Sequence, residues 1–194
     1  MAYQYINRRG DVYHIQAKQR GDKIAYSASR KPAGRLADSI PEGYEIYERP
    51  ENAQVFVRRI RATNILPAER QLLELSIREL AKVKHFIVDV EADSLIVFLP
   101  DAEPDVSLCI LRSTAPMTRE AARSAEAFII SRSTYTKMMR FVLADEKART
   151  FDAQRWCFLG SIDDWHYLAG EKTLEELIKK YVPHLGKESF FDLV

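Results

Sequence analysis

Short β-forming segments separated by glycine-containing turns fill the first sixty residues, and this pattern restricts the fold more than any other feature of the sequence. The two Arg-Gly-Asp triplets at 9–11 and 20–22 are turn signals eleven residues apart, a spacing that suits successive hairpins. Pro41-Glu42-Gly43 marks a further turn before the strand-like segment 44–47. We therefore expect about five short antiparallel strands in residues 1–61, arranged as a β-meander.

Three helices are expected in the remainder of the chain. Leu66, Leu73, Ile77 and Leu80 form an apolar stripe at helical spacing, which predicts a core-facing helix over 66–83. A second helix is predicted over 118–132 from the capping residue at its start, and a third over 173–182 from a Thr-Leu-Glu-Glu capping box.

Two hairpins are expected between these helices, over 85–99 and 138–158, because β-forming runs there flank short charged turns. A short strand is predicted at 106–111, and a helical turn is predicted to open at 161–164. Strands and helices come in blocks rather than alternating one by one. The expected fold class is therefore α+β, with the meander (1–61) and an α+β body (62–194) that either stands apart or joins it in one continuous domain.

Several functions are disfavoured by the sequence. The seven glycines are never closely spaced, which argues against a phosphate-binding loop, and the histidines and two cysteines lack zinc-site spacing. The longest apolar run, 95–99, is far too short to cross a bilayer, and no secretory signal is expected at the N-terminus. We expect no metal, no cofactor and no membrane partner, and a cytoplasmic location.

A metal-dependent nuclease is the one class of enzyme for which we retain specific candidate site residues. Asp89 and Glu91 stand at i and i+2 on one face of the first predicted hairpin, and Asp145 and Lys147 belong to an acidic-x-lysine pattern. If the two hairpins pair, these carboxylates converge on a magnesium ion. The alternative interpretation is that 145–148 is a solvated hairpin turn.

Positive charge and tyrosines gather at the N-terminal end of the chain. Residues 1–61 carry 12 Lys and Arg against 7 Asp and Glu, whereas residues 144–194 carry 7 against 10. Tyrosines interspersed with cations are the ingredients of a surface that stacks single-stranded bases, unless the rings face the core instead. The candidate nucleic-acid-binding cations are Arg8, Arg9, Arg20, Lys23, Arg30 and Lys31.

Four segments of the chain resemble uncharacterised bacterial proteins of no known activity. They are YINRRGD at 5–11, PEGYEIYE at 41–48, RWCF at 155–158 and SIDDW at 161–165. The resemblance implies a full-length bacterial cytoplasmic protein and assigns no site residues.

The sequence therefore predicts a non-enzymatic interaction or accessory protein. Its partner is either another protein or single-stranded nucleic acid bound by the basic meander. If the meander binds nucleic acid, joint removal of Arg8, Arg9 and Arg20 is expected to weaken binding while the fold survives, because exposed turn arginines contribute little to stability.

Overall fold

The computed structural model describes residues 2–21, 23–102, 118–158 and 163–194. The chain forms two compact units: the first contains 1–61 and 101–134, and the second contains 62–100 and 135–194. The sequence-based division kept 101–134 with the body, whereas the contacts group it with the meander. The division into domains itself stays a prediction.

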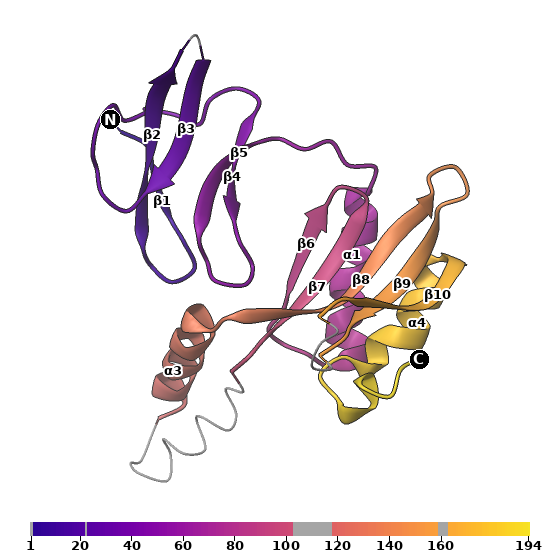
Figure 1. Cartoon of the computed structure of the whole chain (residues 1–194). Helices are drawn as coiled ribbons and strands as arrows, with labels where there is room; N and C mark the ends of the chain where they lie inside the picture. Colours follow the sequence, from indigo (N-terminus) through magenta and orange to yellow (C-terminus); the bar gives the residue numbers. More distant parts are fainter. Residues whose placement is uncertain (1, 22, 103–117, 159–162) are drawn as a thin grey trace. The chain divides into compact units, whose positions relative to one another are not determined.

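The first unit contains the meander that the turn signals predict (Figure 1). One sheet has the strand order β1-β2-β3, and a separate two-stranded ribbon pairs β4 with β5. Gly10 and Gly21 occupy the two hairpin turns with φ of +80° and +58°, a conformation that glycine adopts without steric cost. The strands are β1 (Gln4–Ile6), β2 (Val12–Arg20), β3 (Lys23–Ser29), β4 (Tyr44–Glu48) and β5 (Val55–Arg59).

Helix α3 (Arg119–Arg132) also belongs to the first unit. It begins where the sequence predicts, because the Thr118 hydroxyl accepts a hydrogen bond from the Ala121 backbone N–H at 3.1 Å. The strand predicted at 106–111 lies outside the described residues.

A five-stranded antiparallel sheet forms the centre of the second unit, with the order β10-β9-β8-β7-β6. Both predicted hairpins are present, β6–β7 and β8–β9, and together with the helices they confirm the α+β fold class. The strands are β6 (Ile87–Glu91), β7 (Ser94–Pro100), β8 (Tyr135–Asp145), β9 (Thr150–Trp156) and β10 (Trp165–Thr173).

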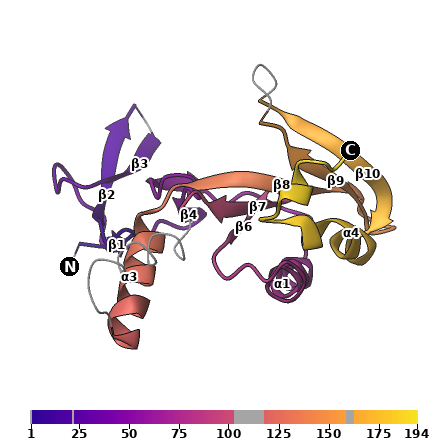
Figure 2. The same cartoon turned by 90° about the horizontal axis from the view of Figure 1, so that it is seen from below.

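Helices α1 (Pro67–Ser76) and α4 (Leu174–Tyr181) lie on the same side of this sheet (Figure 2). The core between them and the sheet includes Leu73, Leu177 and Phe141. The predicted capping box starts α4: the Thr173 hydroxyl and the Glu176 carboxylate each accept from the other residue's backbone N–H. The opposite face of the sheet carries no helix from the described part of this unit.

The apolar stripe predicted for the first helix is only partly correct. Leu73 and Ile77 are fully buried, but Leu66 and Leu80 are 50% and 39% exposed. A π-helical turn over Ile77–Ala81 continues α1, and its wider turn brings Ala81 rather than Leu80 back to the buried face.

The β8–β9 turn is fastened to the start of α1 by Arg149. Its guanidinium forms an ion pair with Glu69 and donates to the Asn64 carbonyl at 3.2 Å. Glu69 also accepts from the Leu66 backbone N–H at 2.8 Å, which satisfies one of the amides at the helix N-terminus.

Arg149→Ala is expected to lower the free energy of unfolding by about 1–3 kcal/mol, because partly buried charged groups lose their partners. Arg70→Ala is a matched control: it breaks an exposed pair with Glu74 on the same helix, which is worth about 0.5 kcal/mol or less. Urea unfolding followed by tryptophan fluorescence measures both, since both tryptophans of the chain lie in the second unit. Equal losses in the two variants would contradict this role of Arg149.

Candidate nucleic-acid interface

Arg8, one of the predicted phosphate-binding cations, instead ties the β1–β2 turn to the end of β4. The Glu48 carboxylate accepts from the Arg8 guanidinium at 3.0 Å, from the Arg8 backbone N–H at 3.2 Å and from the Tyr5 hydroxyl at 3.0 Å. The Arg8 and Glu48 side chains are only 18% and 14% exposed. The expectation that Arg8 is an exposed turn arginine is therefore wrong.

Arg9 lies in the same turn and is also only partly exposed. The buried side chain of Asn7 organises the turn: its carbonyl accepts from the backbone N–H groups of Arg9 and Asp11, and its amide donates to the Ala53 carbonyl at 2.8 Å. The Arg9 guanidinium donates to the Ser133 carbonyl at 3.5 Å. Replacing both arginines would disturb this turn as well as any ligand contact.

Arg30 is held in place and still accessible. Its Nε donates to the Tyr13 hydroxyl at 3.2 Å, its Nη2 donates to Asp11 at 2.8 Å, and its side chain is 61% exposed. The hydrogen bond and proximity of Tyr13, and then the Asp11 carboxylate, raise the pKa of Arg30 above its ordinary value. The result is a fixed cation at the surface.

The remaining three predicted cations, Arg20, Lys23 and Lys31, are exposed. Arg20 and Lys23 are paired at the tip of the β2–β3 hairpin. These three residues are suited to contacting phosphates, since no change in the fold is needed to reach them.

Several meander tyrosines are used in packing. Tyr13 is buried, Tyr5 is bound to Glu48, and the Tyr26 ring meets the Tyr44 ring edge-on at 5.1 Å. These rings are not arranged as a continuous base-stacking platform, which fits the core-packing interpretation of the β1–β3 tyrosines.

A different aromatic surface lies on the β4–β5 ribbon. The pairing of Tyr47 with Phe56 and of Glu45 with Arg58 places these side chains on one face of the ribbon. The Arg58 guanidinium lies 3.6 Å from the Tyr47 ring centroid, and the Arg49 guanidinium lies 5.0 Å from that of Phe56. We call the set Arg49, Arg58, Tyr47 and Phe56 the arginine–ring face. The alternation of arginine and aromatic residues in 47–58 was the available sequence signal.

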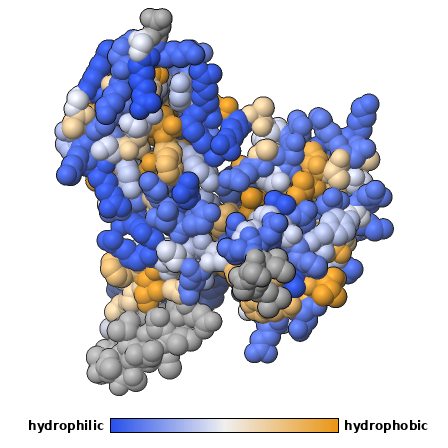
Figure 3. All heavy atoms as spheres, in the orientation of Figure 1, coloured by the Kyte–Doolittle hydropathy of each residue, from blue (hydrophilic) through white to orange (hydrophobic). Residues whose placement is uncertain are grey.

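Charge is unevenly divided between the two units. The first contains 16 Lys and Arg against 12 Asp and Glu, and the second contains 13 against 16. In Figure 3, hydrophilic residues cover most of the first unit on the side that is seen, with apolar residues near its middle. The first unit therefore has a net charge of +4 and the second a net charge of −3.

The nuclease candidates are not brought together. Glu91 pairs with Ser94 and Ser94 with Val142, so strand β7 separates β6 from β8. Asp145 lies three residues further along β8, where its carboxylate accepts from the backbone N–H groups of Lys147 and Ala148 at 2.7 and 2.8 Å. This is the geometry of a turn, and no His, Cys, Asp or Glu cluster suited to a metal occurs among the described residues.

The helix-free face of the five-stranded sheet carries a second group of cations and rings. The Lys137 ammonium lies 3.4 Å from the centroid of the buried Trp156, and the Arg140 guanidinium lies 4.5 Å from that of Trp165. Arg140 also donates to the Gln154 side chain at 2.7 Å. Desolvation lowers the pKa of Arg140, although Asp164 opposes this effect. The protein's own Lys137 and Arg140 therefore already contact these two rings. The rings also lie in the unit that has more Asp and Glu than Lys and Arg.

Tyr5 makes the stability of the first unit depend on pH in the alkaline range. Burial, followed by the negative charge and hydrogen bond of Glu48, raises the pKa of Tyr5 from 10.0 to about 12. The folded unit favours the neutral phenol, so this stabilisation is complete below pH 10 and is lost as the pH rises towards 12.

Tyr5→Phe is expected to flatten the fall in stability of the first unit between pH 10 and 12. It should also remove the phenol that titrates near pH 12 from the absorbance titration of the nine tyrosines. Tyr26→Phe serves as the control because its ring lies in the same unit without a bond to Glu48. An unchanged titration in Tyr5→Phe would contradict the assignment.

Comparison of the chain with protein-family models, curated proteins and solved structures found no match. The resemblance to an uncharacterised bacterial family stays a prediction. Among the described residues, no helix is both long and apolar enough to span a bilayer.

Proposed function

We propose that this chain is a non-enzymatic binding protein that holds single-stranded nucleic acid on its first unit. The Arg58 guanidinium stacked 3.6 Å from the Tyr47 ring centroid is the main support for this proposal. The proposal keeps the bacterial cytoplasmic setting expected from the sequence. Within residues 1–61 it moves the binding surface from the tyrosines of β1–β3 to the arginine–ring face on β4–β5.

The chemistry follows from the two faces of a guanidinium plane. The Arg58 guanidinium lies on the Tyr47 ring, and its side chain is 21% exposed. An unpaired base would stack on the exposed part of this plane. The ion pair of Arg58 with Glu45, at 2.8 Å, fixes the orientation of the plane. Because every base has a π-face, such stacking recognises single strands with little regard to sequence.

Exposed cations provide the second part of the interaction. Arg20 and Lys23 at the hairpin tip, with Lys31 beyond β3, carry charge that phosphates neutralise. Each such contact releases condensed counterions, so affinity depends on salt even though sequence does not matter.

Fluorescence anisotropy with a labelled oligouridine tests the proposal. The double variant Arg49→Gln/Arg58→Gln is expected to weaken binding by about tenfold or more, since each lost base stack costs roughly 1–3 kcal/mol. Arg78→Gln is the matched control, because it removes a guanidinium 5.2 Å from the Phe86 ring in the second unit. Hydrogen exchange of the β4–β5 amides verifies that the ribbon stays folded.

The assignment of this face would be overturned if Arg78→Gln lost as much affinity as the double variant. It would also be overturned if the double variant lost no affinity while its β4–β5 amides stayed protected from exchange. Absence of any oligouridine binding would overturn nucleic-acid binding itself. The protein-partner interpretation would then be the one to pursue.

A further inference from the structure

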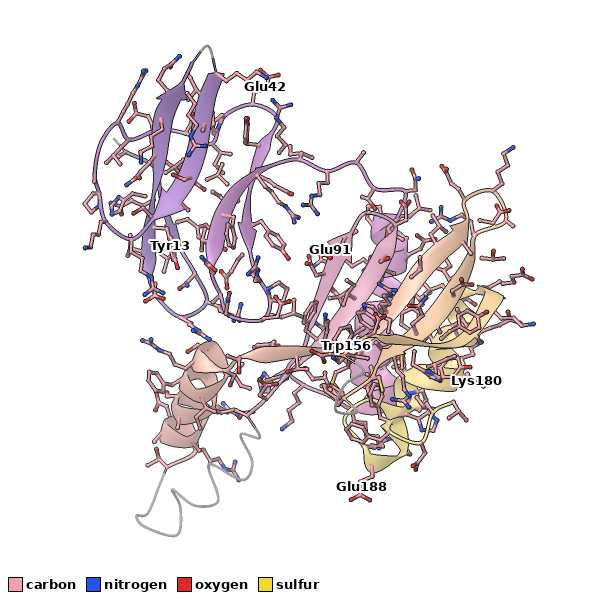
Figure 4. The ribbon with its side chains drawn as sticks, in the orientation of Figure 1. Tyr13, Glu42, Glu91, Trp156, Lys180 and Glu188 are labelled. Atoms are coloured by element: carbon pink, nitrogen blue, oxygen red, sulfur yellow. The ribbon has the colours of Figure 1, made fainter. Side chains whose placement is uncertain are left out.

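A cleft opens in the first unit between the β2–β3 hairpin and the β4–β5 turn. Its volume is about 400 Å³, within the range of small-molecule sites. Tyr13 and Val55 line it and are themselves buried, so they form its floor. Figure 4 labels Tyr13 on β2. The floor of the cleft is thus aromatic and aliphatic.

Polar residues also line the cleft. The lining residues include Asn52, Gln54 and Ser29, whose side chains carry amide and hydroxyl groups. Asn52 uses its side-chain oxygen to accept from the Gln54 backbone N–H at 2.9 Å. Amide side chains are suited to hydrogen-bonding the edge of a nucleobase, which presents both donors and acceptors.

Arg30 is the only charged residue among the described residues that line the cleft. Its guanidinium is fixed from two sides, by the Tyr13 hydroxyl and by Asp11, and lies 5.6 Å from the Tyr13 ring centroid. A cation that is already oriented loses little conformational entropy when it binds an anion. Its planar fork also matches the geometry of phosphate oxygens.

We infer that this cleft binds a single nucleotide unit, with the base over Tyr13 and Val55 and the phosphate on Arg30. The inference rests on the proposed function and deepens it, because it assigns a discrete nucleotide site to the unit that holds the strand. It is separate from the arginine–ring face, which stacks bases without enclosing them.

Titration of the full chain with adenosine 5′-monophosphate, followed by NMR shifts of the Ala28 and Val55 amides, tests the inference. Binding is expected to be saturable in the millimolar range or tighter, about tenfold weaker for adenosine, and absent for ribose 5-phosphate. Arg30→Gln is expected to reduce the affinity for the monophosphate about tenfold and to leave that for adenosine unchanged. Gln54→Ala is expected to weaken both. Lys31→Gln, the adjacent cation outside the lining, is the control.

Equal affinity for monophosphate and nucleoside, or an equal loss in the Lys31 control, would overturn the role of Arg30. No saturable shift with adenosine 5′-monophosphate would overturn the cleft while oligouridine binding persists. The converse result, nucleotide binding without strand binding, would support the cleft and overturn the proposed function.

Discussion

Arg8→Ala is expected to destabilise the first unit by about 2–4 kcal/mol, because it leaves the Glu48 carboxylate partly buried without its charged partner. The same substitution removes guanidinium hydrogen bonds to the carbonyls of Arg49 and Pro50. These contacts join the β1–β2 turn to the β4–β5 turn, so their loss is expected to loosen both.

Hydrogen exchange is the suitable measurement, since the first unit contains no tryptophan. Amides of β1, β2 and β5 should exchange faster in Arg8→Ala. Arg20→Ala at the hairpin tip should change stability by about 0.5 kcal/mol or less, as exposed surface substitutions do. Similar protection in both variants would show that the Arg8–Glu48 pair does not hold the turns together. Arg8 is accordingly unsuitable as a test of nucleic-acid contact.

Leu73→Ala is expected to lower the free energy of unfolding by about 2–5 kcal/mol, because it opens a cavity in the core. Leu80→Ala, on the π-helical continuation of the same helix, should cost about 1 kcal/mol or less. Leu73 is fully buried and Leu80 is 39% exposed. The apolar stripe in the sequence predicts a large loss of unfolding free energy in both leucine variants. The structure predicts a large loss only in Leu73→Ala.

Urea unfolding measured by tryptophan fluorescence compares the two leucine variants directly. The substitution is chemically identical at both positions, so the difference reports burial alone. Equal losses would mean that Leu80 packs as the regular helical period requires. In that case the π-helical turn at 77–81 would not exist in solution.

Local signals in the sequence were sufficient for the elements that local chemistry determines. The capping residues Thr118 and Thr173 start their helices as predicted, and glycine marks the meander turns. Strand β10 was not predicted, and the helical turn expected at 161–164 lies partly outside the described residues. Register irregularities between Tyr167 and Ala169 and between Ala169 and Lys172 break the alternation by which a strand is recognised.

The candidate site was harder to predict because exposure depends on tertiary contacts. The sequence alone does not distinguish Arg8, Arg20 and Arg30. In the structure, Arg8 is paired with Glu48, Arg20 is exposed, and Arg30 is held beside Tyr13. The pairing of Tyr47 with Phe56 depends on the register of β4 and β5. Composition indicated cations and aromatics in this unit, and only the fold shows which of them lie together.

We propose that the first unit binds single-stranded nucleic acid through phosphates and stacked bases. The most direct test is a titration of the full chain with labelled oligouridine at about 50 mM and about 200 mM salt, a range over which phosphate contacts respond strongly. The wild-type affinity should fall steeply between the two. In Arg20→Gln/Lys23→Gln the slope of log affinity against log salt should be shallower by about 1.4, since each phosphate contact to a single strand contributes about 0.7. Affinity that is undetectable at the lower salt, or that is the same at both, would contradict the account.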